Sequence, residues 1–325
     1  ARHKRHQITC EEDRNMSHPP LVHIGYQKTA SPFLQKRVFA DETVFVRPWG
    51  AQAAPAIEHF FLEHPEHFDP AAVRDAFGTH GDRIPVISQE DLAGFPVHAL
   101  YCAETVARRI KATFPDARIL ICIREQISMI VSLYFQFIRQ GGTRSLRSML
   151  QDNDNKVGFR PVIRKEHFEY DLMYRLLRQH FDADQILMLP HELLRQAPDQ
   201  YFAKINNLLG TSLAPSLAKE TVFAKRGGAA ARTELFFNKL VPMPPDLPPD
   251  YTDYPLRIRA RNRLVRNIDK FTTKYTNLGR AFEENVKAEA VSYLGDHFAA
   301  SNSRLTQLLG DDMAALGYPT VPNDQ

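Results

Sequence analysis

The chain has 325 residues, a length that fits one large α/β unit or one domain with an extension. Hydrophobic residues make up 43% of it and charged residues 24%, which excludes wholesale disorder. The formal net charge is +3, from 41 basic and 38 acidic residues. This balance argues against a general nucleic-acid or membrane binder, so we expect no nucleic-acid partner, but it allows a local basic pocket for an anionic ligand. The three cysteines show no Cys-x-x-Cys spacing, so they indicate neither a zinc site nor a disulfide framework: Cys10, Cys102 and Cys122.

The start of the chain is polar and of mixed charge. Residues 1–15 have no apolar period, and Met16 stands just before the first strand-like segment. We therefore expect residues 1–15 to be a leader outside the fold, and residues 16–325 to form a single domain. No run approaches the roughly 18 uncharged apolar residues that a membrane-spanning helix requires, and we expect a cytoplasmic protein.

Short apolar runs alternate with stretches of helical period along most of the chain. Four runs predict buried strands: residues 21–26, 85–88, 117–123 and 185–190. Helical patterns lie between and after them: from Phe33, then 99–114, 126–140 and 168–181, and a helix through Phe202 and Leu209. Strands that alternate with helices predict an α/β fold with a central parallel sheet flanked by helices.

The C-terminal third has a different composition. Residues 241–255 include six prolines in fifteen residues, which predicts an extended, exposed connection. Beyond it, residues 258–268 and 282–309 have helical period, the second segment being long and amphipathic. We expect a helical C-terminal cap from about residue 256 rather than a second folded domain.

A glycine, a lysine and a run of small residues follow the first predicted strand. Gly25 and Lys28 precede Thr29, Ala30 and Ser31, and a helix comes next. This arrangement directs backbone N–H groups and a helix N-terminus at one point, which favours a bound phosphate or sulfate. The segment is not a Walker loop, because G-x-x-x-x-G-K-[ST] is absent and the lysine precedes the small residues.

Residues 25–31 resemble the 5'-phosphosulfate loop of sulfotransferases that use 3'-phosphoadenosine 5'-phosphosulfate (PAPS). A second segment is similar to the family's 3'-phosphate motif: Arg124 ends the strand at 117–123, and Ser132 follows on the next helix. Arg124 would grip a phosphate with its guanidinium at the carboxyl end of a strand, and Ser132 would donate a hydroxyl hydrogen bond.

The resemblance extends to a later helix-strand region. The stretch from Tyr170 to residue 194 resembles the corresponding part of the family, with its glutamate at Glu192. The similarity thus covers roughly residues 20–210. It implies a P-loop-like parallel sheet with a helical C-terminal extension, PAPS as co-substrate and no metal requirement.

The resemblance also implies roles for particular residues. Lys28 would stabilise negative charge on the leaving 5'-phosphate and the bridging oxygen as the bond breaks. Arg226 lies in a basic, glycine-containing segment that resembles a late loop closing over the 3'-phosphate. The implied cofactor-binding residues are Lys28, Thr29, Ala30, Ser31, Pro32, Phe33, Arg124, Ser132 and Arg226. Pro32 departs from the pattern, because the family usually has a serine or threonine there; proline removes both a hydroxyl and an N–H but suits the first helical turn.

A general base is expected close to the transferred group. Glu90 comes just after the strand at 85–88, in a region where family members place a histidine or glutamate, and we predict it to be the base. His98, His23 and Glu42 are the alternatives.

The leading hypothesis is a sulfotransferase that moves a sulfuryl group from PAPS, by in-line displacement, to a hydroxyl or amine. The acceptor is a small molecule, a glycan or a lipid head group, and the sequence does not distinguish them. One alternative is a non-catalytic nucleotide-binding scaffold of the same fold. The other is a P-loop kinase, which should have a second glycine before its lysine and an acidic residue ending a strand to hold magnesium. The oligomeric state is not indicated by the sequence.

Overall fold

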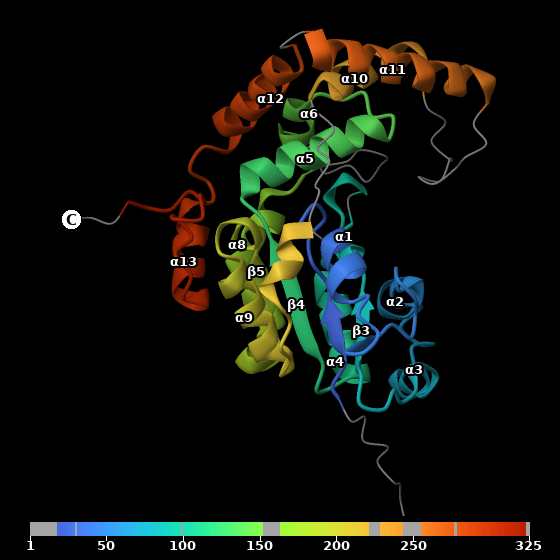
Figure 1. The fold of residues 1–325 in the computed structure, drawn as a ribbon, viewed down its shortest axis with the longest axis vertical. Coiled ribbons are helices and arrows are strands. Elements are labelled where there is room, and N and C mark those ends of the chain that lie inside the picture. The colour runs from blue at the N-terminus through green and yellow to red at the C-terminus, as the bar shows by residue number, and fades with distance from the viewer. Residues whose placement is uncertain are drawn as a thin grey trace, which may run out of the picture.

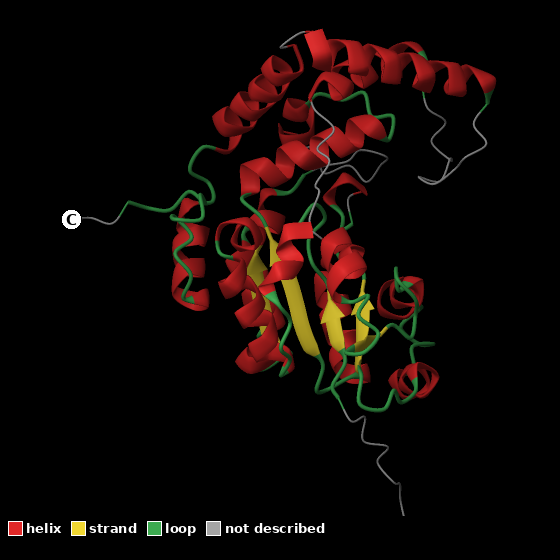
Figure 2. Cartoon of the chain, viewed as in Figure 1, coloured by secondary structure: helices red, strands yellow, loops and turns green. Residues whose placement is uncertain are grey.

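The computed structural model of the chain describes residues 18–29, 31–98, 100–151, 163–220, 228–242, 255–275 and 278–322. Their centre is a parallel sheet of five strands in the order β2-β3-β1-β4-β5 (Figure 2). The strands are β1 Leu21–His23, β2 Phe45–Val46, β3 Ile84–Ser88, β4 Arg118–Ile123 and β5 Ile186–Pro190. The predicted α/β fold with a central parallel sheet is therefore confirmed.

All four predicted strands are present, and the first is shorter than expected. β1 ends at His23, although the chain continues beside β4 through hydrogen bonds from Ile24 N to Leu120 O and from Tyr26 N to Cys122 O. The strand β2 was not predicted. Two residues are too few to give the alternation by which a strand is recognised in sequence.

Helices cover the sheet, and one of them crosses above the edge to which its strands point (Figure 1). The helices up to residue 209 are α1 Ser31–Phe33, α2 Ala54–Ile57, α3 Pro70–Phe77, α4 Ala103–Thr113, α5 Gln126–Arg139, α6 Leu146–Gln151, α7 Tyr170–Leu177, α8 His191–Gln196 and α9 Pro198–Leu209. The crossing helix is α5. It ends at the Gly141-Gly142 pair that predicted its C-terminus.

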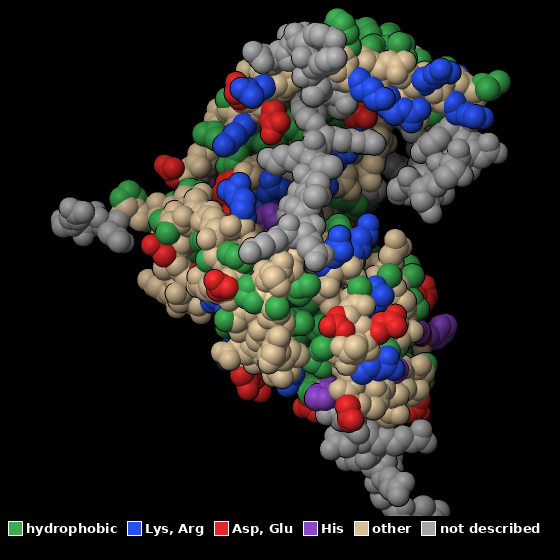
Figure 3. All heavy atoms as spheres, in the orientation of Figure 1, with side chains coloured by type: hydrophobic (Ala, Val, Ile, Leu, Met, Phe, Trp, Pro, Cys, Tyr) green, Lys and Arg blue, Asp and Glu red, His purple; other side chains and the backbone are tan. Residues whose placement is uncertain are grey.

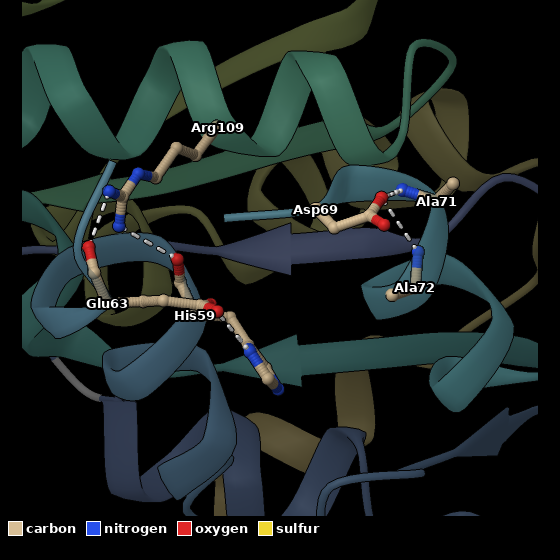
Figure 4. Close-up of polar contacts among 6 residues, drawn as sticks. All are labelled: His59, Glu63, Asp69, Ala71, Ala72 and Arg109. Carbon is tan, nitrogen blue, oxygen red and sulfur yellow. Dashed lines mark hydrogen bonds and ion pairs between the residues drawn. The ribbon is translucent and has the colours of Figure 1, made fainter. Parts of the chain in front are cut away.

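A buried arginine fastens α4 to the neighbouring π-helical turn Glu58–Leu62 (Figure 4). Arg109 is 2% exposed and donates to the carbonyl oxygens of His59, at 3.0 Å, and Glu63, at 2.6 Å. Nearby, the Asp69 carboxylate accepts from the backbone N–H groups of Ala71 and Ala72 and caps α3. The two carbonyl partners of Arg109 give this buried side chain a structural role.

The C-terminal region is helical, but its division differs from the prediction. The helices are α10 Gly228–Leu240, α11 Leu256–Tyr275, α12 Leu278–Leu294 and α13 Ala299–Leu309. The prediction of one helix over residues 282–309 is wrong, because α12 ends before Gly295, whose φ of 46° suits glycine and stops the helix. The helix α10 was not predicted.

The helices α10, α11 and α12 form a layer above α5, and α13 packs against α7 (Figure 1). The expected leader, residues 1–15, and residues 243–254 of the proline-rich stretch lie outside the described part of the chain. Within that part, no helix has the length and apolar character needed to cross a membrane. The single-domain organisation remains a prediction.

Candidate active site

Three predicted site residues follow neighbouring strands of the sheet. Lys28 lies in the loop after β1, Glu90 after β3 and Arg124 directly after β4. Because β1 lies between β3 and β4 and all three are parallel, these loops share one edge. From β1 the chain continues to β2 on one side of the sheet, and from β4 it continues to β5 on the other side. The boundary between β1 and β4 is therefore a topological switch point, and open α/β sheets bind ligands at such points.

The loop after β1 is tightly shaped. A Cβ atom on Gly25 would lie 2.7 Å from His23 Nε2 and 3.2 Å from the backbone nitrogen of Cys122, so a larger residue would have to displace the buried His23 ring. Lys28 has a φ of 67°, in the left-handed region that a lysine adopts only where surrounding structure holds it. Thr29 is buried, and its hydroxyl donates to the carbonyl of Tyr26. Thr29 can therefore offer its backbone N–H to a ligand, while its hydroxyl proton stays within the loop.

The helix after this loop begins at Ser31, two residues earlier than predicted, and continues from α1 into a π-helical turn, Leu34–Val38. Pro32 is exposed in the first helical turn, where a missing N–H leaves no intrahelical bond unmade. The side chains of Ser31 and Phe33 are buried. Ala30 lies outside the described residues.

Lys28 lies in a concentration of positive charge. Burial lowers its pKa from the ordinary value, and the guanidinium groups of Arg139 and Arg124 lower it further, while Glu90 opposes them. Arg124 Nη1 also donates to the backbone carbonyl of Lys28, at 3.3 Å. The two predicted binding elements thus meet at one point, and the three cations around it fit an anion of more than one negative charge.

The main chain on both sides of Arg124 is held by several hydrogen bonds. The Glu125 carboxylate accepts from the N–H groups of Ile127 and Ser128, each at 2.8 Å, and so caps α5. The Tyr170 hydroxyl donates to the carbonyl of Arg124 at 2.6 Å. These contacts fix the backbone at Arg124 and therefore the position from which its side chain extends.

Glu192, which the family resemblance points to, links the turn after β4 to the segment beyond α13 through two hydrogen bonds. Its Oε1 accepts from the N–H of Glu125 at 3.0 Å, and its Oε2 accepts from the Tyr318 hydroxyl at 2.8 Å. Burial is the main cause that raises the pKa of Glu192. Both carboxylate oxygens therefore have structural partners that join the turn after β4 to the segment beyond α13.

One face of α5 turns half-exposed polar side chains outward. Ser132 belongs to it, together with Ser128, Gln136 and Arg139. Spacings of four, four and three residues place the set along one side of the helix. Since the Arg139 guanidinium lowers the pKa of Lys28, the Arg139 end of this face lies near the loop after β1. Arg139 was missed by sequence reasoning, although its helical spacing from Ser132 was a usable signal.

Glu90 begins the 3-10 turn Glu90–Ala93, just after β3, as predicted. Burial raises the pKa of its carboxyl above the ordinary value, Asp91 raises it further, and the Ser31 hydroxyl and the Lys28 ammonium oppose the shift. The Gln27 side chain ties this turn to the lysine loop, donating to Asp91 Oδ1 at 3.1 Å and to the carbonyl of Gly94 at 2.8 Å. A carboxylate with a raised pKa beside a lysine is suited to accept a proton.

The alternative bases lie in different surroundings. Glu42 is exposed and precedes β2, which places it near the amino ends of the parallel strands, at the opposite edge from Lys28. His23 is fully buried, and its Nδ1 lies 2.8 Å from the hydroxyl oxygen of Ser88. The side chain of His98 and all of Arg226 lie outside the described residues.

The burial of His23 predicts a loss of stability in acid. Burial lowers its pKa to about 4, against 6.5 ordinarily, so the folded chain keeps the ring neutral while the unfolded chain protonates it. The free energy of unfolding should therefore fall as the pH drops from about 6.5 to about 4, with His23 contributing about 3 kcal/mol. Urea unfolding of the wild type and His23→Asn across this range measures the effect. The variant should show a shallower fall, and identical slopes would contradict this account of His23.

Two of the comparisons with known proteins found sulfotransferases. Residues 95–215, which include Arg124, Ser132 and Glu192, match the model of the sulfotransferase family. A sulfotransferase from Alicyclobacillus acidocaldarius is similar in structure, with a TM-score of 0.52 and 17% identity, over 92% of this chain and 98% of that chain. Mouse sulfotransferase SULT7A1 complexed with PAP aligns with a TM-score of 0.36 and 12% identity, over 82% of this chain and 88% of that one. No curated protein sequence matches significantly.

The class of the protein follows from the fold: it is an α/β protein with a parallel sheet whose architecture is that of a solved bacterial sulfotransferase. The resemblance to the sulfotransferase family, predicted from two motifs, is confirmed by the family match over residues 95–215. The lysine loop precedes the matched region.

Proposed function

We propose that this chain is an enzyme that transfers a sulfuryl group from PAPS to a hydroxyl or amine acceptor. The observation that carries the proposal is the hydrogen bond from Arg124 to the carbonyl of Lys28, with Glu90 close enough to influence the lysine. The bond joins the loop and the arginine that the proposal assigns to the donor, and the candidate base follows a strand that ends at the same edge of the sheet. These are the groups that sulfuryl transfer needs from a protein.

The chain's own residues would divide the donor between them. In the proposal, Lys28 and the backbone N–H groups of the following loop and helix hold the 5' end. Arg124 and Ser132 hold the 3'-phosphate. Thr29, Ala30, Ser31, Pro32 and Phe33 complete the 5' cradle, and Arg226 covers the 3'-phosphate from its own loop. PAPS supplies an activated sulfuryl group joined to a phosphate that leaves readily.

The proposed chemistry depends on positively charged side chains that are already positioned before the substrates react. The Lys28 ammonium stabilises negative charge that grows on the bridging oxygen, and the neighbouring Arg124 and Arg139 strengthen the positive field. Glu90 accepts the proton of the acceptor hydroxyl or amine. Its raised pKa makes it a stronger base than an exposed glutamate. The acceptor is proposed only by class: a small molecule, a glycan or a lipid head group.

Thermal shift with 3'-phosphoadenosine 5'-phosphate (PAP), in buffer free of divalent metal, tests donor binding. PAP at about 100 times its Kd should raise the Tm by roughly 4 °C, because a ligand that binds only the folded state stabilises it. Stabilisation by ATP with magnesium but not by PAP would favour a kinase instead. Binding of PAP without any transfer from radiolabelled PAPS, across a panel of hydroxyl and amine acceptors, would favour a non-catalytic scaffold.

The pH dependence of transfer tests the role of Glu90. The carboxylate must be ionised to accept a proton, so activity should fall as the pH drops through a pKa above the ordinary 4.5. Lys28 must stay protonated, so activity should also fall as the pH rises through a pKa below the ordinary 10.5. Glu90→Gln should lower kcat about 100- to 10,000-fold and remove the acid limb from the remaining activity. An acid limb that persists in Glu90→Gln would assign the base to another residue.

A further inference from the structure

The outer face of α11 carries two rows of side chains that the candidate active site does not use. Arg259, Arg263, Arg266 and Lys270 are exposed and follow at spacings of four, three and four residues, so they form one row, here called the basic stripe. Leu256, Leu264 and Phe271 are 81%, 46% and 61% exposed, and their spacings of eight and seven residues form the adjacent apolar stripe.

The opposite face of α11 holds the helix against the protein. Ile258 and Val265 are buried there, and Arg261 bonds to the side-chain oxygen of Asn238 in α10. Asn238 in turn donates to the carbonyl oxygens of Ile138 and Gly142, at 2.7 and 2.8 Å, around the end of α5. The inner face of α11 is therefore held against α10 and the end of α5, and its outer face points away from them.

The two stripes lie side by side on the surface. Figure 3 shows Lys and Arg side chains along the front of α11 and hydrophobic side chains along the upper, outer side of the same layer. The layer also carries Phe236 and Leu240 of α10, each 60% exposed and four residues apart. A helix of low overall hydropathy that places large apolar side chains beside a row of arginine and lysine is typical of helices that lie in the plane of a membrane interface.

We propose that the outer face of α11 docks on the surface of an anionic lipid bilayer. The apolar stripe enters the boundary between head groups and acyl chains, and the basic stripe meets the anionic head groups. Charge complementarity selects this occupant: a second copy of the chain would add its own four cations to the contact. A soluble polyanion would match the basic stripe but would leave the apolar stripe in water. The proposal is independent of the proposed function, because no active-site residue takes part.

Sedimentation with lipid vesicles tests the proposal. The full chain should bind vesicles of three parts phosphatidylcholine to one part phosphatidylglycerol, bind pure phosphatidylcholine vesicles far more weakly, and dissociate as salt is raised. Arg263→Gln/Arg266→Gln should weaken binding to the anionic vesicles by about 30-fold. The matched control is Arg83→Gln/Arg108→Gln, which removes two exposed arginines from the body of the protein and should bind like the wild type.

A second pair of variants separates a membrane from the other occupants. Leu264→Ser/Phe271→Ser should also weaken vesicle binding, and tryptophan emission of Phe271→Trp should shift to the blue only with anionic vesicles. All substituted residues are exposed, and melting curves check that the variants fold. Equal binding by the stripe and control variants would overturn the proposal. So would binding to heparin without binding to anionic vesicles, or a dimer that Leu264→Ser/Phe271→Ser dissociates while vesicles are not bound.

Discussion

Replacing Lys28 with alanine is expected to lower kcat for sulfuryl transfer by about 100- to 1000-fold, the range found when one preorganised charge-stabilising group is removed from an active site. The physical reason is that its ammonium is half-buried beside Arg124 and Arg139, where a charge acts more strongly than in water. Rates with radiolabelled PAPS and an acceptor found by screening measure the change.

The matched control for this prediction is Lys36→Ala. Lys36 is exposed on the π-helical turn a few residues further along, so its loss should leave kcat within about twofold of the wild type. Because the left-handed φ of Lys28 strains a lysine, Lys28→Gly should keep the fold and lose the rate as well. A Lys28→Ala enzyme that keeps most of its kcat and shows only a higher KM would mean that the lysine binds the donor without assisting transfer.

The second large effect is expected at Arg124. Arg124→Ala should weaken PAP binding by roughly 10- to 100-fold, because a charge-assisted hydrogen bond to a phosphate contributes about 1.5 to 3 kcal/mol. Arg124→Lys should recover only part of the affinity, since an ammonium lacks the planar fork of a guanidinium. Isothermal titration of the wild type and both variants measures the affinities.

Adenosine 5'-phosphate serves as the matched ligand for this prediction. It lacks the 3'-phosphate, so its affinity should change little in Arg124→Ala if the guanidinium acts at the 3' end. Arg124 also donates to the carbonyl of Lys28, and loss of that bond alone would disturb the 5' cradle. An equal loss of affinity for both nucleotides would therefore assign Arg124 to support of the lysine loop instead of the 3'-phosphate.

Those strands and helices whose burial produces a clear pattern of apolar residues could be predicted from the sequence. Strands such as β4 are buried along nearly their whole length and read as continuous apolar runs, and α5 carries a wide apolar face that ends at two glycines. The strand β2 is too short for such a pattern. The break between α12 and α13 was missed because the helical period continues on both sides of Gly295, whose positive φ is a property of the folded chain.

Only part of the candidate active site could be predicted from the sequence. The motifs placed Lys28, Glu90 and Arg124 after strands, and parallel pairing brings those strand ends to one edge. The bond between Arg124 and the carbonyl of Lys28 joins residues 96 positions apart, so no local pattern could reveal it. The same holds for Glu192, whose partner Tyr318 lies near the end of the chain. Sequence similarity can single out such a residue without distinguishing a structural fastener from a binding group.

A crystal structure of the chain with bound PAP would test the central claim most directly. The account predicts one nucleotide across the carboxyl edge of the sheet, with its 5'-phosphate against Lys28 Nζ and the backbone N–H groups that follow, and its 3'-phosphate against the guanidinium of Arg124. A nucleotide that contacts only one of these two side chains, or that binds away from the ends of β1 and β4, would contradict it.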